Sequence, residues 1–203
     1  KFQKYVRSDI EDLLTKYFNV EKIRKNKIKP YSKIKRISIF PVSNSPIRSM
    51  TVQLLENFVS FFQQNYQVEI IFDDSSIISN YLEKNLKNKN YIKYAPTSIK
   101  GLCEKILDTD FGIFMDSGPL HFAKSFNIRG VLITSSVDGK VLLNNFNSIK
   151  IIDNSFESSY CKSPCGLTNL FNWNSQVGCY DFLNIEKNDL VNTKNLNSLQ
   201  RGG

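Results

Sequence analysis

The sequence predicts an α/β fold in which a parallel sheet carries helices on both of its faces. Short apolar runs that are typical of buried strands alternate with longer segments of helical character along most of the chain. The length of 203 residues and the hydrophobic content of 41% are sufficient for one domain with a substantial core. No apolar run approaches the ~20 residues that a membrane-spanning helix needs.

The expected strands are apolar runs that end in polar, glycine or proline residues. They are residues 36–42, 67–72, 91–94, 111–115, 130–134 and 148–152. The expected helices between them are residues 51–64, 75–86, 97–107 and 119–126. In the first of these helices we expect Phe58, Phe61 and Phe62 in the core, because they belong to its apolar pattern. Thr97 and Ser98 are expected to cap the third helix.

Three regions are expected along the chain. Residues 1–35 form a helix and a basic linker, and the helix begins at the capping box Ser8-Asp9-Ile10-Glu11. Residues 36–192 form the main domain, in which 153–192 is an ordered closing segment with the single tryptophan, Trp173. Residues 193–203 form a polar tail.

The charge of the chain allows several anionic partners. The formal net charge is +8, and lysines cluster in residues 21–35 and 84–93 together with Asn and Ile. This balance is compatible with phosphorylated substrates, an anionic membrane surface or nucleic acid. No zinc finger, RNA-recognition signature or arginine-rich arm accompanies it. We therefore expect no nucleic-acid partner, and a nucleic-acid-binding α/β domain stays only as a hypothesis based on charge.

The four cysteines suggest structural thiols. Cys103 lies in a helical pattern and is expected to be buried, whereas Cys161, Cys165 and Cys179 gather near the C-terminus. Three thiolates with a fourth ligand could bind zinc, but the sequence lacks the CxxC spacing. A disulfide would need an oxidising compartment. We rank reduced thiols first, zinc second and a disulfide third, and we expect no metal at the functional site.

The segment Asp116-Ser117-Gly118-Pro119-Leu120-His121 is the strongest functional signal. It follows the strand at 111–115 and opens the helix at 119–126, with Pro119 in the first turn. The free N–H groups and the dipole at such a helix start bind anions, especially phosphates. The only histidine of the chain, His121, lies one turn inside the helix. Similar turns also occur without a ligand, and a lone histidine is often a packing residue.

A second candidate segment follows the first strand. It is the polar loop 43–48, which contains Ser43, Asn44 and Arg48. In open parallel sheets, ligands bind beyond the carboxyl ends of the strands, at a switch in strand order. The loop 43–48 and the turn at 116–121 both lie at carboxyl ends, so they could face one cleft. Asp73 and Asp74 follow the second strand, but without a glycine fingerprint we expect them to be turn residues.

The order of these motifs resembles the C-terminal domain of the glycosyltransferase family 9 heptosyltransferases, over about residues 36–190. The family signature is Asp-Thr/Ser-Gly-Pro-x-His, and residues 116–121 match it. Before it, Pro96-Thr97-Ser98-Ile99 opens a helix, and the segment 108–115, which contains the strand at 111–115, follows. After it come the Val131-Leu132-Ile133 strand and Cys161-Lys-Ser-Pro-Cys165.

The resemblance implies the C-terminal half of a GT-B fold, which consists of two Rossmann-like domains with the active site between them. In this family the C-terminal domain holds a nucleotide-sugar donor, typically ADP-heptose. Heptose is transferred to the inner core of lipopolysaccharide, a glycolipid acceptor, with inversion and without a metal or cofactor. The implied location is the cytoplasm, with peripheral contact at an anionic inner membrane.

The resemblance also implies roles for the site residues. The catalytic residues are Arg48, which neutralises charge on the leaving diphosphate, and His121, which lies near the phosphates or the sugar. The donor-binding residues are Ser43, Asn44, Asp116, Ser117, Gly118 and Pro119. Among these, Ser117 and Gly118 offer backbone N–H groups to the diphosphate, and Asp116 binds a sugar hydroxyl or orients the turn.

The chain also departs from the family pattern. The first loop lacks the usual glycine and the tryptophan after the basic residue, and residues 135–139 lack the usual Phe-Gly-x-Thr. The family's catalytic base is expected on the N-terminal acceptor domain, which we do not expect within these residues, so the isolated chain is expected to bind donor without efficient transfer. The alternative is a non-catalytic nucleotide-sugar or phosphate-binding module that has diverged from the family.

Overall fold

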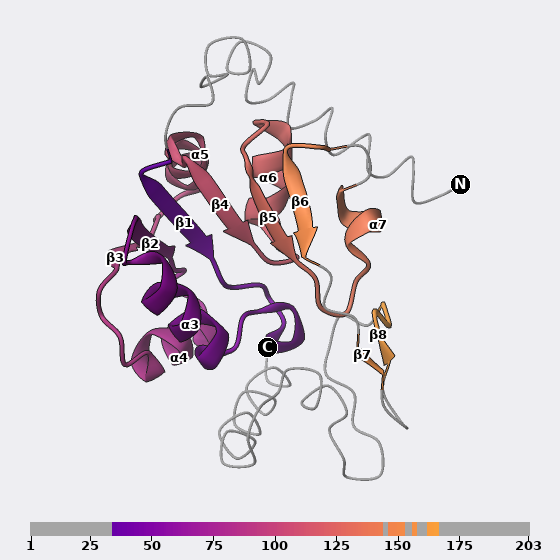
Figure 1. The fold of residues 1–203 in the computed structure, drawn as a ribbon, viewed down its shortest axis with the longest axis horizontal. Helices are drawn as coiled ribbons and strands as arrows, with labels where there is room; N and C mark the ends of the chain where they lie inside the picture. The colour runs from indigo at the N-terminus through magenta and orange to yellow at the C-terminus, as the bar shows by residue number, and fades with distance from the viewer. Residues whose placement is uncertain (1–33, 144–145, 153–155, 158–161, 167–203) are drawn as a thin grey trace.

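The computed structural model describes residues 34–143, 146–152, 156–157 and 162–166 (Figure 1). Within these residues it confirms the predicted fold class, because six parallel strands form one sheet in the order β3-β2-β1-β4-β5-β6. The strands are β1 (Arg36–Phe40), β2 (Gln67–Ile71), β3 (Ile92–Tyr94), β4 (Phe111–Phe114), β5 (Gly130–Ile133) and β6 (Ile149–Ile152). Two short strands, β7 (Phe156–Glu157) and β8 (Lys162–Ser163), pair antiparallel.

The helices connect consecutive strands. They are the 3₁₀ turn η1 (Pro46–Arg48), α3 (Val52–Phe62), α4 (Ile77–Asn85), α5 (Ile99–Asp108), α6 (Gly118–Ser125) and α7 (Gly139–Leu143). The predicted cap is confirmed for α5, where the Gly101 N–H donates to Ser98 Oγ over 3.1 Å. The predicted helix at residues 8–18, Trp173, Cys161 and Cys179 lie outside the described residues.

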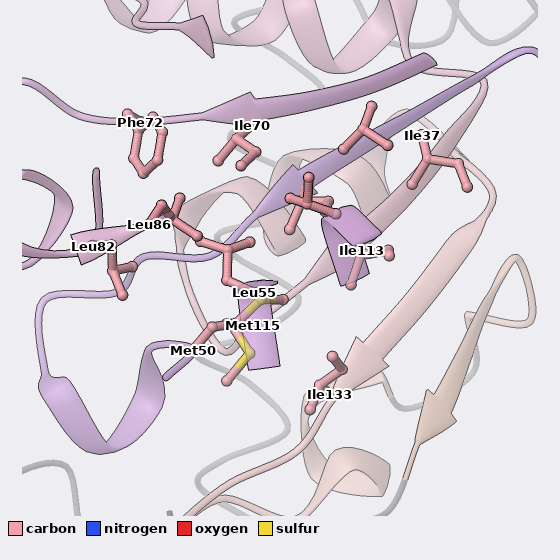
Figure 2. Packing of buried hydrophobic residues seen from close by; sticks show 13 residues of the cluster. Ile37, Met50, Leu55, Ile70, Phe72, Leu82, Leu86, Ile113, Met115 and Ile133 are labelled. Carbon is pink, nitrogen blue, oxygen red and sulfur yellow. The ribbon is translucent and has the colours of Figure 1, made fainter. Parts of the chain in front are cut away.

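Alternation along the strands divides the core between the two faces of the sheet. Ile37, Ile39 and Ile70 lie in one cluster with buried residues of α3 and α4, part of which Figure 2 shows. Phe40 and Phe114 point to the opposite face, where α5, α6 and α7 supply the packing residues. The helices that follow β1 and β4 therefore cover opposite faces, although the two strands are hydrogen-bonded neighbours.

The ring of Phe114 fills the space above two glycines. It is fully buried and stacks on Phe40 with 4.9 Å between ring centroids. Gly112 and Gly130 pair across β4 and β5 beneath it. A Cβ added at Gly112 would lie 2.2 Å from the Phe114 ring. A Cβ at Gly130 would lie 2.2 Å from the backbone oxygen of Gly112, so both positions require glycine for close packing.

A buried charge pair joins β2 to α5 on the same face. The Lys105 Nζ lies 2.5 Å from Glu69 Oε2, and both side chains are at least nine-tenths buried. The hydroxyl of Ser38 donates a second hydrogen bond to the same carboxylate over 3.1 Å. Arg36 adds a longer contact of 3.7 Å to Glu69. The carboxylate is thus well satisfied, as a buried charge has to be.

The structure corrects one core prediction and adds elements that the sequence did not reveal. Phe61 is not a core residue, since 67% of it is exposed; its ring makes an edge-to-face contact with Phe62, with 5.1 Å between centroids. The predicted helix at 51–64 ends earlier, at Phe62. The short elements η1 and α7 were not predicted. Over the described ranges, no helix combines the length and apolar character that crossing a bilayer requires.

Candidate functional site

The sheet order creates a crevice at the carboxyl ends of β1 and β4. Phe40 and Phe114 are register partners at the ends of these strands. The chain leaves β1 toward α3 on one face and leaves β4 toward α6 on the other, so a crevice opens between the loops that begin at these two neighbouring strand ends. This is the switch point at which open α/β sheets bind ligands. The structure therefore brings together the loop 43–48 and the turn 116–121, whose proximity the sequence left open.

A pocket of about 610 Å³ lies in this crevice. It is lined by every site residue that the sequence predicted, namely Ser43, Asn44, Arg48, Asp116, Ser117, Gly118, Pro119 and His121. An apolar part of the wall is formed by Phe40, Val42, Ile71 and Phe72. The volume falls within the range of pockets that bind small organic ligands, roughly 300–1,000 Å³.

The first loop is held in shape by the Ser49 hydroxyl. Ser49 Oγ accepts a hydrogen bond from the Ser43 N–H at 2.9 Å and lies within hydrogen-bond distance of the carbonyl oxygens of Ser43 and Ser45. The Met50 N–H donates to the Pro41 carbonyl and closes the base of the loop. These bonds fix the backbone on both sides of η1, and Arg48 at the end of η1 lines the pocket.

The second loop presents the start of α6 to the pocket. Ser117 is the N-cap residue, but its hydroxyl does not cap the helix and donates instead to the Met115 carbonyl over 3.4 Å. In contrast, Ser76 caps α4 and Ser98 caps α5 through their side chains. The Leu120 N–H already donates to the Ser117 carbonyl over 3.1 Å, and Pro119 has no N–H. Because the first turn of α6 lacks a side-chain cap, the N–H groups of Ser117 and Gly118 are the ones that it can offer to an anionic ligand.

Gly118 is the most open point of this helix start. It is exposed, and a Cβ added to it would meet no atom within 4 Å. His121 follows on the same short helix, is half-buried and lines the pocket. The first turn therefore combines an accessible backbone with an imidazole beside the same cavity.

Arg48 and Asp116 connect the two loops. Arg48 Nη1 lies 3.4 Å from Asp116 Oδ2. Asp116 is almost completely buried, whereas about a fifth of the Arg48 side chain is exposed. Arg48 Nε is buried and has no hydrogen-bond partner within the described part of the chain. The guanidinium is therefore only partly satisfied by the protein, as expected of a group that also binds a ligand.

The pocket extends further than the sequence predicted, toward the carboxyl ends of β2 and β3. The additional lining residues are Asp73, Ser76, Pro96, Thr97, Ser98, Ile99 and Leu102. Asp73 is also the turn residue that the sequence predicted, because its Oδ1 accepts hydrogen bonds from the N–H and hydroxyl of Ser75. These lining residues lie in the loops after β2 and β3 or at the start of the helices that follow those strands. The order of the strands in the sheet was needed to place these segments beside the loop after β1.

The composition of the pocket suits an amphipathic anion. Arg48 and the start of α6 offer positive charge and N–H donors at the β1–β4 end. The apolar side chains of Pro96, Ile99 and Leu102 line the part near α5. Together they can hold a phosphorylated group at one end and a flat or aliphatic group at the other.

The described cysteines do not contribute to this site. Cys103 is buried in the core, as predicted, and burial raises the pKa of its thiol to about 11, with a smaller contribution from Glu104. It is therefore a protonated packing residue at neutral pH. Cys165 is an exposed free thiol. Within the described ranges, no group of three or more His, Cys, Asp and Glu side chains could hold a metal ion.

We predict that Gly118→Ala separates folding from ligand binding. The change in the free energy of unfolding should stay below about 1 kcal/mol, because the new methyl group meets no atom and alanine favours helix. Binding of a nucleoside diphosphate should weaken, because the methyl group occupies the approach to the helix start. Denaturant unfolding and calorimetric titration measure the two effects.

Gly101→Ala is the matched control, because Gly101 lies in the first turn of α5 but does not line the pocket. It should leave both quantities nearly unchanged. Unaltered diphosphate binding by Gly118→Ala would contradict a role for this helix start.

Comparisons with known proteins agree with this architecture. No protein-family model matches the chain, and a search of curated protein sequences found no match. Among solved structures, Escherichia coli ADP-heptose lipopolysaccharide heptosyltransferase II matches with a TM-score of 0.51 and 14% identity, over 69% of this chain and 44% of that one. E. coli heptosyltransferase WaaC with ADP gives a TM-score of 0.48 and 8% identity, over 58% of this chain and 36% of that one.

The chain thus spans less than half the length of the heptosyltransferases that it resembles in structure. At 14% identity the first of these likenesses concerns the fold alone. Together with the strand order and the parallel register, it establishes a Rossmann-like α/β domain of the kind found in GT-B glycosyltransferases.

Proposed function

We propose that this chain is the donor-binding domain of an inverting, metal-independent glycosyltransferase that transfers heptose from ADP-heptose to lipopolysaccharide core or a related glycan. The observation that carries the proposal is the meeting of Arg48 with the uncapped start of α6 in one pocket at the β1–β4 switch point. A cation and a helix N-terminus together favour a diphosphate. The shared fold with a heptosyltransferase supports this choice of ligand.

Each residue has a role in this proposal. The backbone N–H groups around Ser117 and Gly118 bind the diphosphate, and Arg48 neutralises the charge that develops on it when the glycosidic bond breaks. His121 stands beside the phosphates or the sugar, and Asp116 accepts a hydrogen bond from a sugar hydroxyl. Ser43 and Asn44 complete the donor-binding wall on the β1 side.

The remaining parts of the reaction are assigned to partners. We propose that an N-terminal acceptor domain supplies the catalytic base and the site for a glycolipid acceptor. Such a reaction would take place on the cytoplasmic side, with peripheral contact at the anionic inner membrane. Arg48 is the group of this chain that would replace a metal ion in stabilising the leaving diphosphate.

A thermal-shift and calorimetric titration with ADP, UDP, GDP and ADP-heptose tests the proposal. We expect ADP and ADP-heptose to stabilise the chain selectively. We expect Arg48→Gln to lower the binding affinity for each of the two compounds by about tenfold or more, since it removes a charge-assisted bond. Lys100→Gln is the control, because Lys100 is an exposed cation of the neighbouring α5 that does not line the pocket. It should bind as the native chain does.

Stabilisation by another nucleotide would keep the donor site and change the sugar nucleotide. No response to any of the four compounds would refute the proposed donor site in this chain. A loss of affinity in Lys100→Gln as large as that in Arg48→Gln would instead indicate nonspecific attraction by the net positive charge.

A non-catalytic nucleotide-sugar-binding module is the second candidate. It is favoured by residues 135–139, which depart from the family pattern and do not line the pocket among the described residues. One assay distinguishes the two candidates. It measures heptose transfer from ADP-heptose to heptose-free lipopolysaccharide in the presence of a heptosyltransferase N-terminal domain. Transfer that depends on Arg48 supports the enzyme, and tight donor binding without transfer supports the module.

A further inference from the structure

The ion pair between Arg48 and Asp116 occupies the groups that would bind the two parts of a nucleotide sugar. Arg48 would hold the diphosphate and Asp116 the sugar, yet in this structure they contact each other, with 3.4 Å between Nη1 and Oδ2. Within the described part of the chain, the Asp116 carboxylate accepts its hydrogen bond from Arg48. A ligand that takes one member of the pair therefore changes the surroundings of the other.

The pair is weak enough to exchange partners. Charge-assisted hydrogen bonds are commonly about 2.7–2.9 Å long, so a contact of 3.4 Å leaves both groups with unused bonding capacity. Arg48 Nε is also buried without a partner in the described part of the chain. A diphosphate that offers several oxygen acceptors would satisfy the guanidinium better than this single carboxylate contact does.

The two kinds of nucleotide ligand affect Asp116 differently. A free nucleoside diphosphate takes Arg48 away and brings negative charge close to a buried carboxylate, and it offers few donors in return. A nucleotide sugar carries one negative charge fewer on its terminal phosphate. Its sugar hydroxyls can donate hydrogen bonds that compensate Asp116 for the loss of Arg48.

We propose that Asp116 discriminates between the nucleotide-sugar donor and the nucleoside diphosphate product, by exchanging its partner from Arg48 to a sugar hydroxyl. This inference rests on the proposed function and adds a specificity-determining role for one residue of the site. In the donor complex, Arg48 binds the diphosphate and Asp116 binds the sugar. Once the sugar has been transferred, Asp116 competes again for Arg48, which weakens the hold on the diphosphate and promotes its release.

Isothermal titration of ADP and ADP-heptose into the native chain and Asp116→Asn tests this role. The substitution removes the charge and keeps the shape of the side chain. We expect ADP to bind about tenfold more tightly to Asp116→Asn, and ADP-heptose to bind equally or more weakly, so that the preference for donor over product falls by at least about tenfold. If the chain binds UDP or GDP in place of ADP, the same comparison is made between UDP and UDP-glucose or between GDP and GDP-mannose.

Asp73→Asn is the matched control, because Asp73 is a carboxylate that lines the same pocket without contacting Arg48. It should change both affinities by the same factor. In the Arg48→Gln background, the gain in ADP affinity from Asp116→Asn should shrink, because the competition for Arg48 has been removed. Circular dichroism verifies folding, and Asp116→Ser provides the same test if the asparagine variant does not fold.

The outcomes separate this inference from the proposed function. If Asp116→Asn changes the affinities for ADP and ADP-heptose by the same factor, discrimination by Asp116 is refuted while the donor site stands. If no nucleotide binds the native chain or any variant, the donor site fails and the inference fails with it.

Discussion

Glu69→Ala is expected to lower the free energy of unfolding by about 3–5 kcal/mol, because it leaves Lys105 charged and buried without its partner. Such a loss is a large fraction of the roughly 5–15 kcal/mol by which a domain is stable. The lost hydrogen bond from Ser38 adds to the cost. Urea unfolding monitored by circular dichroism measures the change, and only a small dependence on salt is expected, because buried pairs are weakly screened.

Glu104→Ala is the control for this experiment. Glu104 is also an ion-pair partner of a lysine on α5, but both it and Lys100 are exposed and 4.0 Å apart. Its removal should cost less than about 1 kcal/mol. Replacing Glu69 and Lys105 together by leucine and methionine should recover most of the lost stability, because no buried charge is left unpaired. Equal costs for Glu69→Ala and Glu104→Ala would contradict the buried pair.

Phe114→Ala is expected to lower the free energy of unfolding by about 3–5 kcal/mol, because it removes a fully buried ring and leaves a cavity above two glycines. The stacking on Phe40 is lost as well. Gly112→Ala alone should also destabilise the native chain, since its methyl group would collide with the Phe114 ring. In the Phe114→Ala background, however, Gly112→Ala should not lower the free energy of unfolding any further, because its methyl group then enters the cavity that the ring has left.

Gly130→Ala is the matched negative control for this pair. Its methyl group would collide with the backbone oxygen of Gly112, which Phe114→Ala does not remove. Gly130→Ala should therefore stay destabilising in both backgrounds. Thermal and denaturant unfolding of the single and double variants measure these couplings. Strict additivity of Gly112→Ala and Phe114→Ala would contradict the packing of the ring over Gly112.

Local signals in the sequence were sufficient for the fold class and for most of the elements. The apolar strand at Phe111–Phe114, the helix start with Pro119 in its first turn and the Ser98 cap each depend on neighbouring residues, and the structure contains all three. The predicted site residues were found for the same reason, because they follow strands directly. Their roles in binding and catalysis stay predictions until a ligand is tested.

Other features depend on contacts between distant segments and could not be predicted in this way. The pairing of β1 with β4 decides that Arg48 and Asp116 share a pocket, and no local pattern encodes it. The exposure of Phe61 follows from which stripe of α3 faces the sheet. Buried Leu55 and Val59 define that stripe, and Phe61 lies roughly 200° around the helix from Val59.

The pairing of β1 with β4 also has a consequence for the order in which the molecule folds. Arg48 and Asp116 are 68 residues apart, and β2, β3 and the helices α3, α4 and α5 form between them. A contact of such long range costs loop-closure entropy, which the intervening elements reduce as they pack. The pocket should therefore be complete only in the last stage of folding. During refolding, nucleotide binding should therefore recover later than the helical circular dichroism signal. Its recovery would report the formation of the complete native sheet.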